Sequence, residues 1–104
     1  MAELVEFDAQ DYVGLKKISP HTTVRGLIMQ NGRIAMQRSR DGEYKIPGGG
    51  VEPDEDHITC LKREVAEETG LLVKEETVCF LVETEEKRRD LLHPEQIFQR
   101  HTYF

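Results

Sequence analysis

Three glutamates in the middle of the chain have the residue type and spacing of a divalent-cation site. Glu64 and Glu68 are four residues apart and Glu67 lies between them, so on a helix their carboxylates share one arc of the surface. Hard divalent cations such as Mg²⁺ prefer carboxylate oxygens as ligands. The alternative is a solvated acidic face on which Arg63 and Glu67 form an i,i+4 ion pair. The three glutamates alone do not decide between the two.

The helix that would carry these glutamates has clear expected ends. Asp56 is a short acceptor suited to cap its start, and Gly70 stands where a left-handed residue would end it. At about 100° per residue, an apolar stripe falls beside the glutamates and comprises Ile58, Leu61, Val65 and Thr69. We therefore expect Leu61 and Val65 of this stripe to be buried against a sheet. Lys62 and Ala66 should lie on the outer side.

The residues around the glutamates match a known signature. Gly49 is followed at fixed spacing by Glu55 and then by Arg63-Glu64-Val65-x-Glu67-Glu68-x-Gly70-Leu71. Position for position, this pattern resembles the signature of the Nudix hydrolase family. The resemblance implies an α/β/α sandwich with a mixed sheet, formed here by one domain over residues 1–104. It also implies Mg²⁺-dependent hydrolysis, with Mn²⁺ as a substitute, of a nucleoside diphosphate linked to another group into a nucleoside monophosphate and a phosphorylated remainder.

The resemblance assigns roles to individual residues. Glu64 and Glu68 match the principal metal ligands, and the Gly48 carbonyl matches a backbone ligand. Glu67 matches a position that is a ligand or contributes to base catalysis. Arg63 matches the residue that braces the glutamates by ion pairing, so the expected catalytic set is Glu64, Glu67 and Arg63. The positions expected to support the loop and the helix are Gly49, Glu55 and Gly70.

Departures from the family pattern leave parts of this expectation open. Asp54 stands where many members have glycine. Members often take a further acidic ligand or base from a downstream segment. The glutamates available here are better explained as solvated surface charges, so none is assigned: Glu83, Glu85, Glu86 and Glu95. No accessory pattern identifies the substrate. The competing function is a Nudix-like module that binds nucleotides or partners without catalysis, although retention of all three helix glutamates favours the enzyme.

Composition narrows the choice of partners and compartment. A formal net charge of −6 argues against charge-driven binding of nucleic acid, so we expect a small-molecule nucleotide substrate. No apolar run approaches a membrane span, and Met1 to Leu4 forms no basic leader, so a cytoplasmic protein is expected. Cys60 and Cys79 are too few for a disulfide framework, which predicts reduced thiols.

Strand patterns precede the helix. Thr22 to Gln30 and Arg33 to Arg38 predict a hairpin with Asn31-Gly32 at its turn. Gly26 suggests a bulge or a close backbone approach, and Pro20 predicts a break before the hairpin. Two earlier segments read as weak strand or irregular structure: Glu3 to Phe7 and Tyr12 to Ile18.

Further patterns lie on both sides of the helix. A brief strand at Tyr44 to Ile46 is followed by Gly48-Gly49-Gly50, which predicts a turn whose carbonyls and amides can face a ligand. After the helix, Thr77 to Glu83 predicts a strand buried on both faces and Thr84 to Pro94 a charged connection, with a last strand at Gln96 to Phe104. Three basic residues of the connection indicate either a solvated loop or a phosphate contact: Lys87, Arg88 and Arg89.

The last residues, Tyr103 and Phe104, end an apolar run with no turn signal or polar tail. Nudix domains normally continue with more sheet and a second helix. We therefore expect a domain truncated at the C-terminus. If the 104 residues stand alone, we expect a homo-oligomer that covers the open strand edge and the apolar sheet face.

Overall fold

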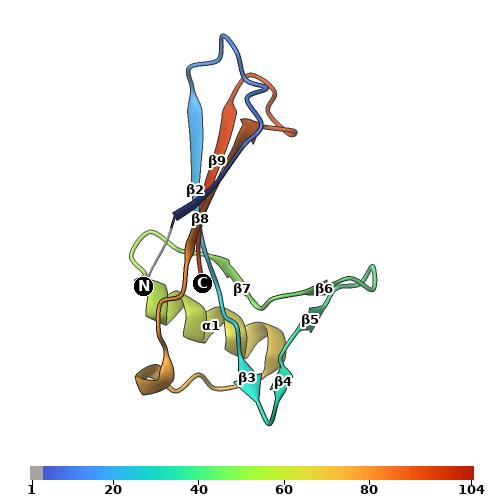
Figure 1. Cartoon of the computed structure of the whole chain (residues 1–104), viewed down its shortest axis with the longest axis vertical. Coiled ribbons are helices and arrows are strands. Elements are labelled where there is room, and N and C mark those ends of the chain that lie inside the picture. Colours follow the sequence, from blue (N-terminus) through green and yellow to red (C-terminus); the bar gives the residue numbers. More distant parts are fainter. Residues whose placement is uncertain (1–3) are drawn as a thin grey trace. The chain divides into compact units, whose positions relative to one another are not determined.

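The structure is a computed structural model that describes residues 4–104. Met1 to Glu3, including the first residue of the expected lead-in strand, lie outside the described residues. The predicted α/β fold with a mixed sheet is confirmed (Figure 1). The described residues contain helix α1 (His57–Thr69) and a five-stranded sheet. Its strands, in spatial order, are β1 (Leu4–Asp8), β8 (Glu83–Arg89), β9 (Ile97–Tyr103), β2 (Ile18–Arg25) and β7 (Gly48–Gly50).

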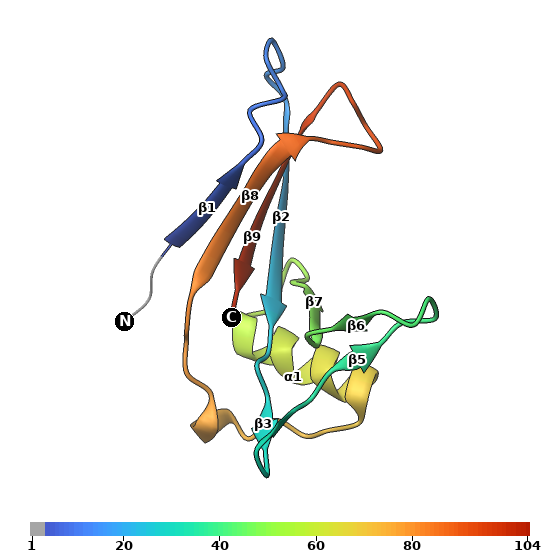
Figure 2. The same cartoon turned by 45° about the vertical axis from the view of Figure 1, so that its right-hand side comes forward.

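The chain forms two compact units, and strand β2 continues from one into the other. The first unit contains residues up to 23 together with 80–103, and the second contains residues 24–79 and Phe104. Strands β1, β8 and β9 belong to the first unit, and α1 and β7 to the second (Figure 2). Within residues 4–104, no helix is both long and apolar enough to cross a membrane.

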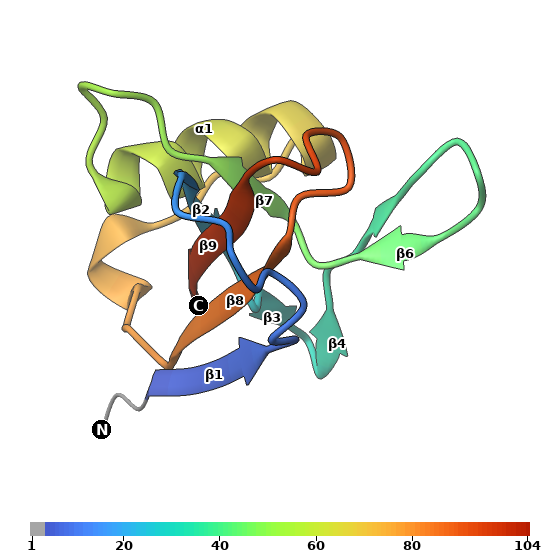
Figure 3. The same ribbon diagram turned by 90° about the horizontal axis from the view of Figure 1, so that it is seen from above.

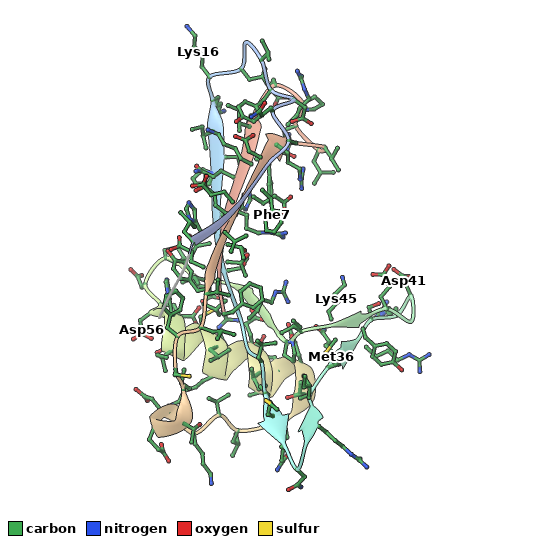
Figure 4. All side chains as sticks on the ribbon, viewed as in Figure 1. Phe7, Lys16, Met36, Asp41, Lys45 and Asp56 are labelled. Carbon is green, nitrogen blue, oxygen red and sulfur yellow. The ribbon has the colours of Figure 1, made fainter. Side chains whose placement is uncertain are left out.

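In the first unit the sheet is mixed because its strand pairs differ in direction. β1 pairs with β8 in parallel, whereas β8 pairs with β9 in antiparallel register. β1 lies at the edge of the sheet and is exposed along its length, and Figure 4 marks Phe7 on this strand. Cross-strand pairs join β8 to β9, including His101 with Glu83 at 2.7 Å and Arg100 with Glu86 at 2.9 Å.

The prediction of a buried strand at Thr77 to Glu83 is wrong. A short 3-10 helix, η1 (Glu75–Thr77), starts this region, and Phe80 and Leu81 are each 51% exposed. The strand is instead β8, in the charged segment expected to be a connection. The charged segment forms the strand because its side chains pair with those of β9, and cross-strand pairs stabilise a sheet. The apolarity of a segment does not show which strand it will pair with.

The three basic residues of that segment therefore lie in a strand, not in a solvated loop. The Lys87 ammonium lies 5.2 Å from the centroid of the Tyr12 ring, and Arg88 lies 4.1 Å from that of Phe98. Arg89 donates to the carbonyl of Asp11 at 3.1 Å. These contacts stabilise the first unit, and the phosphate contact stays untested.

The predicted hairpin is confirmed at its turn but not along its strands. Asn31 and Gly32 both have positive φ, at 52° and 73°, as a two-residue hairpin turn requires. The paired strands, however, are only two residues long each: β3 (Met29–Gln30) with β4 (Arg33–Ile34). The following residues pair separately, as β5 (Gln37–Arg38) with β6 (Tyr44–Lys45), and Figure 4 marks Asp41 in the loop between them.

Two positions before the helix behave in different ways. Pro20 does not break the chain but lies inside β2. In the first unit β2 is next to β9 at the end of that unit's strand order, and edge strands tolerate a residue without an N–H donor. The close approach expected at Gly26 is present, since an added Cβ would lie 2.9 Å from Leu61 Cδ1, although the approaching group is a side chain.

Both expected ends of helix α1 are confirmed. The Asp56 carboxylate accepts a hydrogen bond from the Thr59 amide at 2.7 Å, and Figure 4 marks Asp56 at the start of the helix. Gly70 has φ 75° and its amide donates to the Ala66 carbonyl at 3.0 Å. Local contacts therefore define this helix at both ends, through a side chain at the start and the backbone at the end.

The buried face of α1 differs from the expected stripe. Val65 is buried, as expected, and Lys62 and Ala66 are exposed. Leu61, however, is only half-buried, whereas Cys60 is fully buried. The Cys60 thiol lies 3.5 Å from the Gly50 carbonyl. Because β7 consists of glycines, the helix approaches that strand closely and buries its Cys60 side.

We expect Val65→Ala to lower the free energy of unfolding by roughly 1 to 3 kcal/mol, through lost burial and the cavity left behind. Leu72→Ala is the matched apolar truncation, because Leu72 is 87% exposed, and its cost should stay below about 0.5 kcal/mol. Urea denaturation of both variants measures the difference. Equal losses would show that α1 is not held by this face.

Candidate active site

Strand β7 presents backbone groups, not side chains, to helix α1. Gly48 has φ 154°, and a Cβ added there would overlap the Val24 carbonyl and lie 2.7 Å from Arg25 Cα. The prediction of a turn at Gly48-Gly49-Gly50 is wrong, because these residues form a strand beside β2. Glycine permits both the positive φ and the close approach. Figure 3 shows β7 running alongside α1.

Glu64 and Glu68 both turn toward β7. A Cβ added at Gly49 would lie 2.6 Å from each carboxylate oxygen of Glu64, so this carboxylate packs directly on the glycine backbone. The Gly48 amide donates to Glu68 Oε2 at 3.0 Å. The structure thus brings together the two principal expected ligands and the residue whose carbonyl is the expected backbone ligand.

Glu67 does not join this group. Its side chain is 59% exposed, and its carboxylate lies 3.5 Å from Arg63 Nη1 as an i,i+4 pair. Within residues 4–104, no group of three or more His, Cys, Asp or Glu side chains is arranged to hold a metal ion. The ligand role predicted for Glu67 stays untested, and the ion pair of the alternative interpretation is present.

Arg63 connects the loop before the helix to the acidic face. Arg63 donates two hydrogen bonds to the Glu55 carboxylate, from Nε to Oε2 at 2.7 Å and from Nη2 to Oε1 at 2.8 Å. Its Nη1 donates to Glu64 Oε1 at 2.8 Å, and its Nη2 to the Gly50 carbonyl at 3.2 Å. This network restricts the position of the Glu64 carboxylate, as a bracing residue must.

Glu55 is held within the loop that precedes α1. Its side chain is only 8% exposed, and its Oε1 accepts from the Glu52 amide at 3.1 Å. The hydrogen bonds from Arg63 lower the pKa of Glu55 to about 2. Glu55 therefore remains charged at neutral pH and connects the loop to the helix.

The depressed pKa of Glu55 predicts a pH dependence of stability. Because the folded value is about 2 and the ordinary value is 4.5, the stabilisation is fully present above about pH 4.5 and is lost as the pH falls toward 2. Glu55→Gln should therefore lose stability less steeply than the parent over this interval. Urea midpoints measured from pH 7 to pH 2 test this, with the neighbouring exposed acid in Asp54→Asn as control. Parallel profiles for Glu55→Gln and the parent would contradict it.

The pair Glu64 and Glu68 fits a hard divalent cation. Burial raises the pKa of Glu68, and the neighbouring Glu64 carboxylate raises it further, whereas the Gly48 amide and Arg25 act in the opposite direction. Two ionised carboxylates at this spacing repel each other, and a divalent cation between them would offset the repulsion. The donor set of carboxylate and carbonyl oxygens is the one Mg²⁺ prefers.

Two residues at the site were not identified from the sequence. Arg25 donates from Nη1 to the Gly48 carbonyl at 3.1 Å, although it lies outside the signature, and no local pattern indicates this contact. Cys60 precedes Glu64 by one helical turn, and this spacing could have indicated that Cys60 lies on the same side of the helix as the site. Burial raises the pKa of the Cys60 thiol to about 12, which makes it an inert packing group at neutral pH.

Comparison with known proteins identifies the family of this chain. The family model of the NUDIX domain matches residues 19–104, and the chain belongs to the Nudix family. A MutT-like protein of Streptomyces ambofaciens is 41% identical over 54 residues, which cover 50% of this chain and 35% of that protein. The solution structure of the E. coli ORF135 protein has a similar fold, with a TM-score of 0.55 and 23% identity over 83% of this chain. The chain covers 60% of that structure, so it spans less than two thirds of both relatives.

Proposed function

We propose that the protein is a Mg²⁺-dependent hydrolase that cleaves the pyrophosphate bond of a nucleoside diphosphate linked to another group. The observation that supports this most directly is the convergence of Glu64 and Glu68 on the glycine backbone of β7. Membership of the Nudix family supports the same reaction class. The expected products are a nucleoside monophosphate and the phosphorylated remainder.

In this proposal Glu64, Glu68 and the Gly48 carbonyl would hold the metal, with Mn²⁺ as a substitute. Bound Mg²⁺ supplies charge neutralisation at the phosphate oxygens and lowers the pKa of bound water. The Gly48 amide orients the Glu68 carboxylate, and Arg63 orients that of Glu64. Each residue is therefore pre-positioned by a hydrogen bond within the same unit.

The reaction joins a water oxygen to one phosphorus while the bridging P–O bond breaks and one proton is released. Glu67 is the most exposed of the three helix glutamates, which suits a carboxylate that accepts this proton. Arg63 lies 3.5 Å from the Glu67 carboxylate and orients it. We assign the catalytic set to Glu64, Glu67 and Arg63 on these contacts.

A product assay on a panel of nucleoside diphosphate derivatives tests the proposal. The chain is incubated with each compound in Mg²⁺, in Mn²⁺ and in excess EDTA, and the products are separated by chromatography. We expect a nucleoside monophosphate in equimolar amount with the phosphorylated remainder, in the metal samples only. Turnover that survives EDTA, or release of inorganic phosphate from a terminal ester instead, would contradict it.

The ion pair between Glu67 and Arg63 favours one competing function, a Nudix-like module that binds nucleotides without hydrolysing them. Glu64 and Glu68 converge on β7, but Glu67 pairs with Arg63 instead. Isothermal titration of the same compounds in Mg²⁺ separates the two functions. Micromolar binding combined with intact ligand after long incubation would establish the binding module and exclude the enzyme.

A further inference from the structure

Arg25 bridges two backbone carbonyls, one just before strand β7 and one on it. Its Nη1 donates to the Ile46 carbonyl at 3.0 Å and to the Gly48 carbonyl at 3.1 Å. The carbonyl between them, that of Pro47, accepts from the Gly26 amide at 2.8 Å. Arg25 and Gly26 therefore hold three consecutive carbonyls in the segment that enters β7.

The packing around Gly48 leaves little freedom for this arrangement. A Cβ added at Gly48 would lie 2.7 Å from Arg25 Cα and 2.8 Å from its Cδ, so the arginine backbone and stem both touch the glycine. Pro47 is fully buried beside it. The aliphatic part of the Arg25 side chain therefore has no room to move toward β7, and this keeps the guanidinium beside the two carbonyls.

Gly48 connects Arg25 to the acidic pair. Its carbonyl accepts from Arg25, and its amide donates to Glu68 at 3.0 Å. Displacement of Arg25 would therefore release the Gly48 carbonyl directly, and would loosen the residue whose amide holds the Glu68 carboxylate.

We propose that Arg25 is a positioning residue that holds the Gly48 backbone in the orientation needed for metal binding by Glu68 and the Gly48 carbonyl. This inference rests on the proposed function. Two effects are separable: the bridge between two carbonyls, which Nη1 makes at the full reach of the arginine side chain, and the positive charge, which the shorter lysine side chain retains. The short distances to both carbonyls assign the main effect to the bridge.

Four variants of the full chain test this: Arg25→Lys, Arg25→Gln and, as matched controls on the exposed hairpin, Arg33→Lys and Arg33→Gln. Mg²⁺ and Mn²⁺ affinities are measured by calorimetry at a temperature at which circular dichroism shows each metal-free variant folded. We expect both Arg25 variants to bind metal at least about 10-fold more weakly, and both Arg33 variants within about 2-fold of the parent. Metal affinity within 2-fold of the parent in Arg25→Lys would overturn the proposal, because charge alone would then suffice.

Two further measurements keep the inference distinct from a general loss of stability. In a Glu68→Gln background, Arg25→Lys should weaken metal binding less than it does in the parent, because only the effect through the Gly48 carbonyl then remains; full additivity would overturn the proposal. In the unmodified chain, ¹⁵N NMR should show a slowly rotating Arg25 guanidinium with and without Mg²⁺, and free rotation would overturn it even if the Arg25 variants do not fold. A parent chain that binds no metal overturns the proposed function together with this inference, whereas a binding parent with unaffected Arg25 variants overturns this inference alone.

Discussion

Glu68→Gln is expected to weaken Mg²⁺ binding and hydrolysis by on the order of 100-fold or more, with no loss of folding. The amide keeps the shape of the side chain and can still accept from the Gly48 amide, which donates to Glu68 Oε2 at 3.0 Å. It removes the charge that a divalent cation requires. Because burial and the neighbouring Glu64 carboxylate raise the pKa of Glu68, the ionised side chain is unfavourable in the metal-free protein. The metal-free variant should therefore be at least as stable as the parent at pH 7.

Calorimetry with Mg²⁺ and the product assay measure the two expected losses, and thermal denaturation without metal measures stability. Glu76→Gln is the matched control, because Glu76 is an exposed acid outside the site, and it should leave all three quantities close to the parent. A Glu68→Gln variant that binds Mg²⁺ and turns over substrate as the parent does would remove Glu68 from the site.

Alanine substitutions along the glycine triplet should have three different outcomes. Gly48→Ala is expected to destabilise the protein by about 3 kcal/mol or more, because the new Cβ would meet immobile backbone at Val24 and Arg25 and would require φ 154°. Gly49→Ala would meet the Glu64 carboxylate and should chiefly weaken metal binding. Gly50→Ala should be nearly neutral, since no atom lies within 4 Å of its added Cβ.

The three variants are compared by urea denaturation and by metal titration under the same conditions. Gly50→Ala serves as the internal control for the cost of replacing glycine in this strand, so the differences from it isolate the close contacts. The expected order of stability is Gly50→Ala, then Gly49→Ala, then Gly48→Ala. Equal stability and equal metal affinity in the three variants would mean that β7 does not pack on α1 and β2 as described.

Local chemistry made helix α1 predictable from the sequence. Asp56 and Gly70 define its ends through contacts within a few residues, and the spacing of Glu64 and Glu68 determines that they share one side. The turn at Asn31-Gly32 was predictable for the same reason, because positive φ is a property of those residue types. The signature spacing likewise identified the family that the comparison confirms.

Contacts between distant segments decided the rest. Strand β8 forms in a charged segment because its side chains meet partners on β9 that lie more than ten residues away, such as Arg100 for Glu86. The glycine triplet becomes a strand because it meets the end of β2, and Arg25 reaches Gly48 across 23 residues of sequence. The sequence by itself determined the helix, its caps, the tight turn and the order of the acidic residues, since these depend on bonds within a few residues. Only the tertiary structure decided which carboxylates face β7 and which strands pair, because these depend on groups that folding brings together from separate parts of the chain.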